Sequence, residues 1–207
     1  MRILLAIVCA VVCWGTALAA EANNEAQKEF DALLAKVKQS DASVDFARLR
    51  RLYAQTSAYT PFDDSKEAMF AALNTSDFEK ARSLAEEALK KNYLNVDAHF
   101  VAAFACGKLK DETCAAHHKY VARGVIDSIL GSGDGKSPET ALFVISIGEE
   151  YVVARVLRLR VVNQSLEHKN GHAYDVLTVA DVKTNAESTL FFDIDVITAA
   201  EERLFRK

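Results

Sequence analysis

The chain has 207 residues, 50% of them hydrophobic, with 25 Lys and Arg against 29 Asp and Glu. This length suits one compact domain, or two small halves that share a core. The formal net charge of −4 argues against nucleic acid or an anionic membrane as the main partner.

Residues 1–19 have the pattern of a secretory signal peptide. Arg2 precedes an apolar run, and small residues stand at Ala17 and Ala19. The run is too short for a spanning helix, which needs about 20 apolar residues. We therefore expect cleavage near Ala19, which changes the net charge from −4 to −5 through the loss of Arg2. The protein is then exported, periplasmic or secreted, with no membrane span after processing.

Residues 20–130 have the apolar spacing of helices. A first helix is predicted over 25–38, where the apolar positions are Phe30, Leu33, Leu34 and Val37. A second helix follows through Leu49 and Leu52. It is expected to end before Thr60-Pro61, because proline disfavours helical backbone in the residue before it.

Residues 63–130 contain an internal repeat. A shift of 34 residues aligns identical residues at Phe70/Phe104, Ala81/Ala115 and Ala88/Ala122. This is the tetratricopeptide period, and SDFEKARSLAEEALKKNYLN resembles the second half of such a repeat. We expect two helix hairpins, 63–91 and 95–130. Because about three repeats are needed to bury a continuous core, the flanking segments must cover these two.

The pattern after Gly131 predicts a small sheet with one helix. The apolar run 141–146 predicts a buried strand, and 149–159 predicts a helix. Three more strands are expected in RVVNQSLEH, AYDVLTVADV and STLFFDIDVI, with Asn170-Gly171 as a hairpin turn. In the last strand one face is expected to carry Leu190, Phe192, Ile194 and Val196, and the other Asp193 and Asp195.

These patterns predict the α+β class. Tetratricopeptide-like hairpins in the helical half, 20–130, pack against a small mixed β-sheet with one helix in 131–207. The two halves are expected to share a core, either as one compact domain or as two tightly packed subdomains.

A series of short motifs resembles one protein family. In chain order they are DAHF (97–100), HKYVARGVIDSIL (118–130), SGDGKSPETA (132–141), EEY (149–151), QSL (164–166), YDV (174–176) and FFDI (191–194). The chain from about Ala47 to Ile197 thereby resembles the exported bacterial family with the domain of unknown function numbered forty-nine nineteen. The resemblance implies an exported repeat-plus-sheet protein and supplies no catalytic residues. The family usually has glycine before QSL, where this sequence has Asn163, so a turn there can differ.

The stretch GSGDGKSPET, residues 131–140, ends like a phosphate-binding loop but lacks its context. Such a loop follows a strand and opens a helix, whereas here a helix precedes and a strand follows. Asp134 would also place a negative charge among the phosphate ligands. We favour a structural joint in which Gly131 ends the helix in a left-handed conformation and Ser137-Pro138 caps one helical turn. The alternative is a small anion site of backbone amides assisted by Lys136.

Other polar residues are candidates for ligand binding. His99 and His118 lie on inward helix stripes, where hydrogen-bonded core histidines are favoured over metal ligands because no second motif has ligand spacing. Glu149 and Glu150 point about 100° apart on a helix, and Glu150 is expected to turn inward beside Tyr151 and bond the glycine loop. The candidate ligand-binding residues are His99, His118, Asp134, Lys136, Glu150 and Gln164. No catalytic residue, metal site or cofactor is predicted.

Two cysteines, Cys106 and Cys114, remain after processing. In an oxidising compartment an even pair suits a disulfide, provided that the Cα atoms lie within about 7 Å. The alternative is two ordinary buried thiols.

The leading functional hypothesis is an interaction or binding module of the cell envelope, which holds a peptide or an envelope protein. The alternative is a small-ligand binder or hydrolase-type enzyme with a site at the 131–140 loop, Glu150 and His118. An enzyme is less favoured because no serine or cysteine has the setting of an activated nucleophile. The alternative would gain if His99, His118, Glu150 and Asp134 lined one open pocket.

Overall fold

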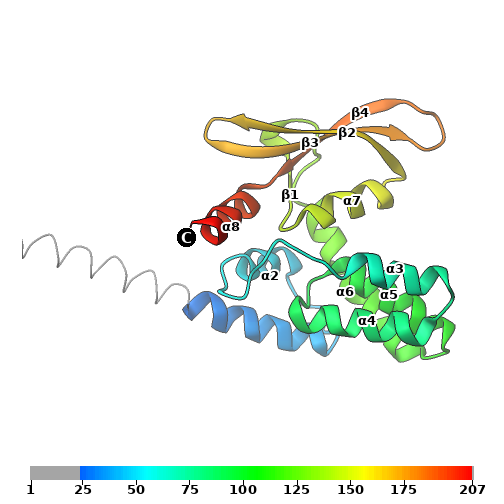
Figure 1. Cartoon of the computed structure of the whole chain (residues 1–207). Coiled ribbons are helices and arrows are strands. Elements are labelled where there is room, and N and C mark those ends of the chain that lie inside the picture. The colour runs from blue at the N-terminus through cyan, green and yellow to red at the C-terminus, as the bar shows by residue number, and fades with distance from the viewer. Residues whose placement is uncertain (1–23, 207) are drawn as a thin grey trace, which may run out of the picture. The chain divides into compact units, whose positions relative to one another are not determined.

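The computed structural model describes residues 24–206 (Figure 1), so the predicted signal peptide lies outside the described residues. The chain forms two compact units, divided between Tyr59 and Thr60. In the first unit, residues 24–38 are helical and helix α2 spans Phe46–Tyr53, as the apolar spacing predicts. Asp45 begins α2 by accepting a hydrogen bond from the amide of Arg48.

The second unit begins with two helix hairpins (Figure 1), which lie where the 34-residue repeat predicts them. Their helices are α3 (Lys66–Asn74), α4 (Phe78–Lys91), α5 (Val96–Lys108) and α6 (Glu112–Leu130). The side chains of Asp77, Asn95 and Asp111 accept hydrogen bonds from amides of the first turns of α4, α5 and α6. Each of these caps satisfies an amide that the helix itself leaves unpaired, and so fixes where the helix begins.

Small residues let the four helices approach closely. Ala81 and Ala115, which are equivalent across the repeat, are both fully buried. Helix α5 packs against α3, α4 and α6. A disulfide joins Cys106 of α5 to Cys114 of α6, with the two Cα atoms 5.8 Å apart. The second hairpin is therefore closed by a covalent link as well as by packing.

The rest of the second unit is a mixed sheet with the strand order β1-β4-β3-β2, which confirms the α+β prediction. The strands are β1 (Leu142–Phe143), β2 (Leu159–Lys169), β3 (His172–Asp181) and β4 (Glu187–Asp193). Strand β1 runs parallel to β4, and the other neighbours are antiparallel. Asn170 and Gly171 form the predicted turn between β2 and β3, with φ values of 54° and 84°.

Helix α7 (Ile147–Val156) connects the hairpins with the sheet. It packs against α5, α6 and β2, all within the second unit. A short helical turn, Pro138–Thr140, precedes β1, and Pro138 occupies its first turn as predicted. The final element is helix α8 (Asp195–Phe205), which packs against β3.

Several predicted boundaries in this half are wrong. The strand expected over 141–146 pairs only at Leu142 and Phe143, and α7 begins at Ile147 and ends at Val156 rather than spanning 149–159. The last strand ends at Asp193, so Ile194 and Val196 do not belong to it. Helix α8 starts at Asp195 instead, because the carboxylate of Asp195 forms hydrogen bonds with the amide of Ala173 and with Nδ1 of His172.

The predicted left-handed conformation of Gly131 is also wrong. Its φ is −80°, because its amide continues the helical hydrogen bonding to Asp127. Gly135, with φ 67°, is the residue of this loop in the left-handed region. Asn163 lies inside β2, at an irregularity in the pairing with β3 between Val161 and Asn163.

Candidate functional site

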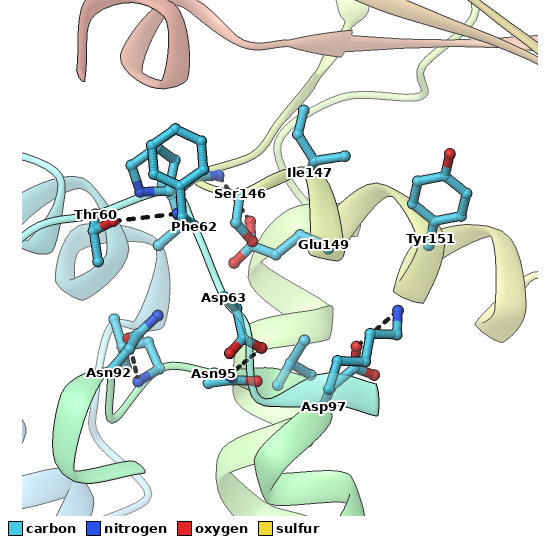
Figure 2. A pocket seen from close by; sticks show the side chains of 16 residues that line it. Thr60, Phe62, Asp63, Asn92, Asn95, Asp97, Ser146, Ile147, Glu149 and Tyr151 are labelled. Carbon is cyan, nitrogen blue, oxygen red and sulfur yellow. Dashed lines mark hydrogen bonds and ion pairs between the residues drawn. The ribbon is translucent and has the colours of Figure 1, made fainter. Parts of the chain in front are cut away.

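A cleft of about 340 Å³ opens in the second unit (Figure 2). Three segments line it: the chain from Thr60 through Lys66, the α4–α5 connection from Asn92 to Asp97, and residues 145–151 at the start of α7. A volume of this size lies at the lower end of the range for small-ligand pockets. It also suits one or two side chains of a bound protein segment.

Aromatic side chains stand at the cleft in exposed positions. Phe62 comes from the extended chain before α3 and is 52% exposed, and Tyr151 comes from α7 and is 38% exposed. Ile145 and Leu94 add buried apolar surface to the walls. The cleft can therefore receive an apolar group and stack it against a ring.

The polar wall of the cleft is held in place by internal hydrogen bonds. The carboxylate of Asp63 accepts a hydrogen bond from the side chain of Asn95 at 2.8 Å (Figure 2) and another from the amide of Ser65 at 2.9 Å. These bonds lower the pKa of Asp63, although burial opposes them as the largest single influence. Because Asp63 and Asn95 belong to different repeats, the bond between them fixes the relative positions of two cleft walls.

Asp97 is a buried charge at the cleft with two cationic partners. Its side chain is only 5% exposed and forms ion pairs with Lys66 of α3 at 3.1 Å and with Arg155 of α7 at 2.6 Å. The Arg155 guanidinium also lies 5.8 Å and 5.5 Å from the ring centroids of Phe70 and Phe100. Removal of Asp97 would leave two cations without their partner, so this carboxylate holds α3 and α7 on opposite sides of the site.

Glu149 lines the cleft at the start of α7. Its side chain is buried and accepts a hydrogen bond from the amide of Ile145 at 2.8 Å. This bond satisfies a backbone donor in the segment that leads into α7. Glu149 therefore fixes the segment that leads into α7.

A hydrogen-bonded chain of side chains runs from Tyr151 toward the sheet. The Tyr151 hydroxyl donates to the Gln164 carbonyl at 2.7 Å, and the Gln164 amide donates to the carboxylate of Asp175. Glu150 lies beside Asp175 and is fully buried. The order of donors makes Asp175 the acceptor at the end of the chain.

Glu150 is a neutral acid at physiological pH. Burial, followed by the negative charge of Asp175, raises its pKa to about 9. Neither of its oxygens accepts a hydrogen bond from a residue within 24–206. An ionised Glu150 would thus be buried without a donor, whereas the protonated form can donate to Asp175. Glu150 does turn inward, but its partner is Asp175 and not the glycine loop.

His99 and His118 form a second buried pair. Their Nδ1 atoms lie 2.8 Å apart, and Nε2 of His99 lies 2.7 Å from the carbonyl oxygen of Tyr93. A carbonyl only accepts, so His99 carries its proton on Nε2 and accepts at Nδ1 from His118. Burial lowers the pKa of His99 to about 3 and that of His118 to about 4. The described chain contains no group of three or more metal-ligating side chains.

The 131–140 loop is closed on itself. Asp134 accepts hydrogen bonds from the Thr140 hydroxyl at 2.6 Å and the Lys136 amide at 3.0 Å, and the Gly135 amide donates to the carbonyl of Thr140. A Cβ added at Gly133 would lie 2.2 Å from the Thr140 carbonyl oxygen. These contacts support the structural joint, because the Gly135 and Lys136 amides are already occupied.

The predicted site residues do not gather in one place. Glu150 and Gln164 meet through Asp175, and His99 meets His118, while Asp134 and Lys136 lie in the 131–140 loop. None of the six lines the cleft. The structure instead uses residues that sequence reasoning did not select: Lys66, Asp97, Tyr151, Arg155 and Asp175. Three of these residues lie in the family motifs: Asp97 in DAHF, Tyr151 in EEY and Asp175 in YDV. Membership in these motifs was the sequence signal that could have identified them.

Comparison with known proteins places the chain in a family. Neither a curated protein nor a solved structure matches it. Between residues 24 and 206 no helix is long and apolar enough to cross a membrane. The model of the family described as domain of unknown function (DUF4919) matches residues 18–203, which include the cleft and the buried pairs. The chain therefore belongs to the DUF4919 family.

Proposed function

We propose that this chain is a protein-binding module of the cell envelope, and that it holds a segment of a partner protein in the cleft and in two shallower depressions beside it. The α3 depression shares Asp63 and Lys66 with the cleft and also contains Phe70 and Asn74. The β2 depression shares Tyr151 with the cleft and is also lined by Arg155, Arg158, Leu159, Arg160 and Val182. The lining residues that the cleft shares with each depression are the observation that carries the proposal.

Exposed aromatic side chains support a macromolecular partner. Besides Phe62 and Tyr151 at the cleft, Phe100 and Phe104 of α5 are 47% and 46% exposed. Exposed aromatic and apolar surface costs free energy in water, and gathered surface of this kind marks interaction sites. Phe104 is the repeat equivalent of Phe70 in the α3 depression, so the two hairpins present phenylalanine at matching positions.

The chemistry of the cleft favours binding over catalysis. Its three carboxylates are all engaged: Asp63 by Ser65 and Asn95, Asp97 by Lys66 and Arg155, and Glu149 by the Ile145 amide. The one acid with a strongly raised pKa near the cleft, Glu150, is fully buried and does not line it. An enzyme would need an acid, base or nucleophile that can reach its substrate.

The envelope location rests on the sequence pattern of residues 1–19, which is that of a signal peptide. A signal fusion tests it: residues 1–19 joined to a reporter that is active only after export should produce activity. An inactive reporter would argue against the location.

Site-specific photo-crosslinking tests the binding function. A photoreactive amino acid at Phe62 in the full-length chain, expressed in its host cell, should give one saturable crosslinked species. The matched control carries the same amino acid at Leu166, which is 58% exposed on β2 and does not line any of the three hollows. Tyr151→Ala should abolish the Phe62 product. Equal products at both positions, or none at Phe62, would refute the proposal.

A further inference from the structure

The three hollows differ in charge along their length. The α3 depression carries the carboxylates of Asp63, Asp64 and Glu67 against the single ammonium of Lys66. The β2 depression carries the guanidinium groups of Arg155, Arg158 and Arg160, and no acidic residue lines it. The aromatic rings of Phe62 and Tyr151 stand at the cleft, which shares lining residues with both depressions. The surface is therefore acidic in the α3 depression, basic in the β2 depression and aromatic at the cleft.

Little of this charge is neutralised within the described chain. Among residues 24–206, Arg158 and Arg160 form no ion pair with an acidic side chain, and the same holds for Glu67. Asp64 lies 3.4 Å from Lys91, but the two side chains are 87% and 72% exposed, so water screens the pair. Both depressions thus present charge that a partner can meet.

Lys66 of the α3 depression and Arg155 of the β2 depression share one carboxylate partner. Both are paired with the buried Asp97, which lies between α3 and α7. Two cations around one carboxylate leave a net charge of 2 − 1 = +1, and the charge of Lys66 also lowers the pKa of Asp63. The α3 depression stays acidic because its three carboxylates outnumber Lys66, and Arg158 and Arg160 add positive charge to the β2 depression.

We propose that the partner segment is bipolar: it carries Lys or Arg side chains where it passes α3, an apolar side chain in the cleft, and Asp or Glu side chains where it reaches Arg158 and Arg160. This inference rests on the proposed binding function and names the chemistry of its partner. Opposite charges in the two depressions set the direction of the segment and reject partners of uniform charge. A nucleic acid would be repelled at α3, and a uniformly basic segment would be repelled at β2.

Selection from a displayed random peptide library tests the inference on the intact mature protein. Enriched peptides should contain basic residues and acidic residues in separate parts of the sequence, together with an apolar or aromatic residue. Their binding should fall by roughly tenfold on Arg158→Glu/Arg160→Glu and on Asp64→Lys/Glu67→Lys. When the library is selected again on a charge-reversed variant, the enriched peptides should change the sign of the charge that faces the reversed side chains and keep the other charge. Lys183→Glu, in the exposed turn after β3, is the control and should leave the selected sequences unchanged.

The possible results distinguish a failure of the bipolar partner from a failure of the proposed binding function. Peptides that bind and are lost on Phe62→Ala, but show no segregation of charge or ignore the reversals, would overturn the bipolar partner alone. Failure to enrich any peptide that depends on Phe62 would overturn the binding function as well. A second copy of the chain as the occupant would appear as a dimer in sedimentation and would also contradict the inference.

Discussion

The helical hairpins and the sheet half of the second unit bury titratable groups of opposite kinds. The hairpins enclose the imidazoles of His99 and His118, whose pKa values burial lowers to about 3 and about 4. The sheet half encloses the carboxyls of Glu150 and Asp175, and burial raises the pKa of Glu150 to about 9. The folded chain accommodates the two histidines and Glu150 in their uncharged forms. The two halves differ in how pH affects their stability: acid destabilises the half with the histidines, and base destabilises the half with Glu150.

The two pairs give opposite slopes of stability against pH. Each histidine has an unfolded pKa of 6.5, so the free energy of unfolding falls as the pH drops from about 6.5 toward the lowered folded values. Glu150 has an unfolded pKa of 4.5, so its contribution falls as the pH rises from about 4.5 toward about 9. Between about pH 4.5 and pH 6.5, the two histidines make the free energy of unfolding rise with pH, and Glu150 makes it fall. These groups together therefore predict maximal stability near the unfolded histidine pKa of 6.5.

The largest difference between the halves is expected at their glycines. Gly133→Ala should lower the free energy of unfolding by about 3 kcal/mol, because the new Cβ would meet the carbonyl oxygens of Thr140 and Ala141. Gly107→Ala in α5 has open space around the new Cβ and should raise it by about 0.5 kcal/mol. Urea unfolding at pH 6.5 measures both. Equal effects of the two substitutions would contradict the tight closure of the 131–140 loop.

The carboxyl pair gives the next largest effect. Glu150→Gln should raise the free energy of unfolding by about 2 kcal/mol at pH 8 and by almost nothing at pH 5, because the amide donates to Asp175 without the need for a bound proton. Urea unfolding at the two pH values measures the change. Glu187→Gln, at the exposed start of β4, is the control and should have little effect at either pH. A gain that is the same at both pH values would rule out a raised pKa for Glu150.

The histidine pair gives a smaller effect of opposite sign. Wild-type protein should lose stability between pH 6.5 and pH 5, and His118→Asn should reduce that loss by about 1 kcal/mol because one neutral imidazole is removed. The asparagine amide can still donate to Nδ1 of His99. The test compares the difference between the two pH values, since the substitution also changes packing. An unaltered acid-side slope would show that His118 titrates normally.

The sequence predicts the hairpins well because their apolar positions recur at helical spacing. The same logic fails after Asp193, where Leu190, Phe192, Ile194 and Val196 continue a strand pattern although α8 begins at Asp195. A tertiary contact decides the outcome there: Asp195 accepts a hydrogen bond from the amide of Ala173 on β3. Alternation along one strand carries no information about such a contact.

The site was less predictable than the fold. The inward turn of Glu150 follows from its place beside buried positions of α7, but its partner Asp175 belongs to β3 and only the three-dimensional packing brings them together. Lys66 and Arg155 meet at Asp97 because α3 and α7 both pack against α5, and the 34-residue period says nothing about α7. The cleft could therefore not be assembled from spacing alone.

The irregular pairing in β2 affects how separate molecules behave toward one another. Strand β2 is eleven residues long and lies at an edge of the sheet, where an unpaired strand is a template for the strand of another molecule. The register shift between Val161 and Asn163 bends this edge, and Arg160, Glu167 and Lys169 place charges along it. The bend and the charges make it unfavourable for a strand of another molecule to pair with β2. A local departure from regular pairing thereby protects concentrated protein from edge-to-edge aggregation.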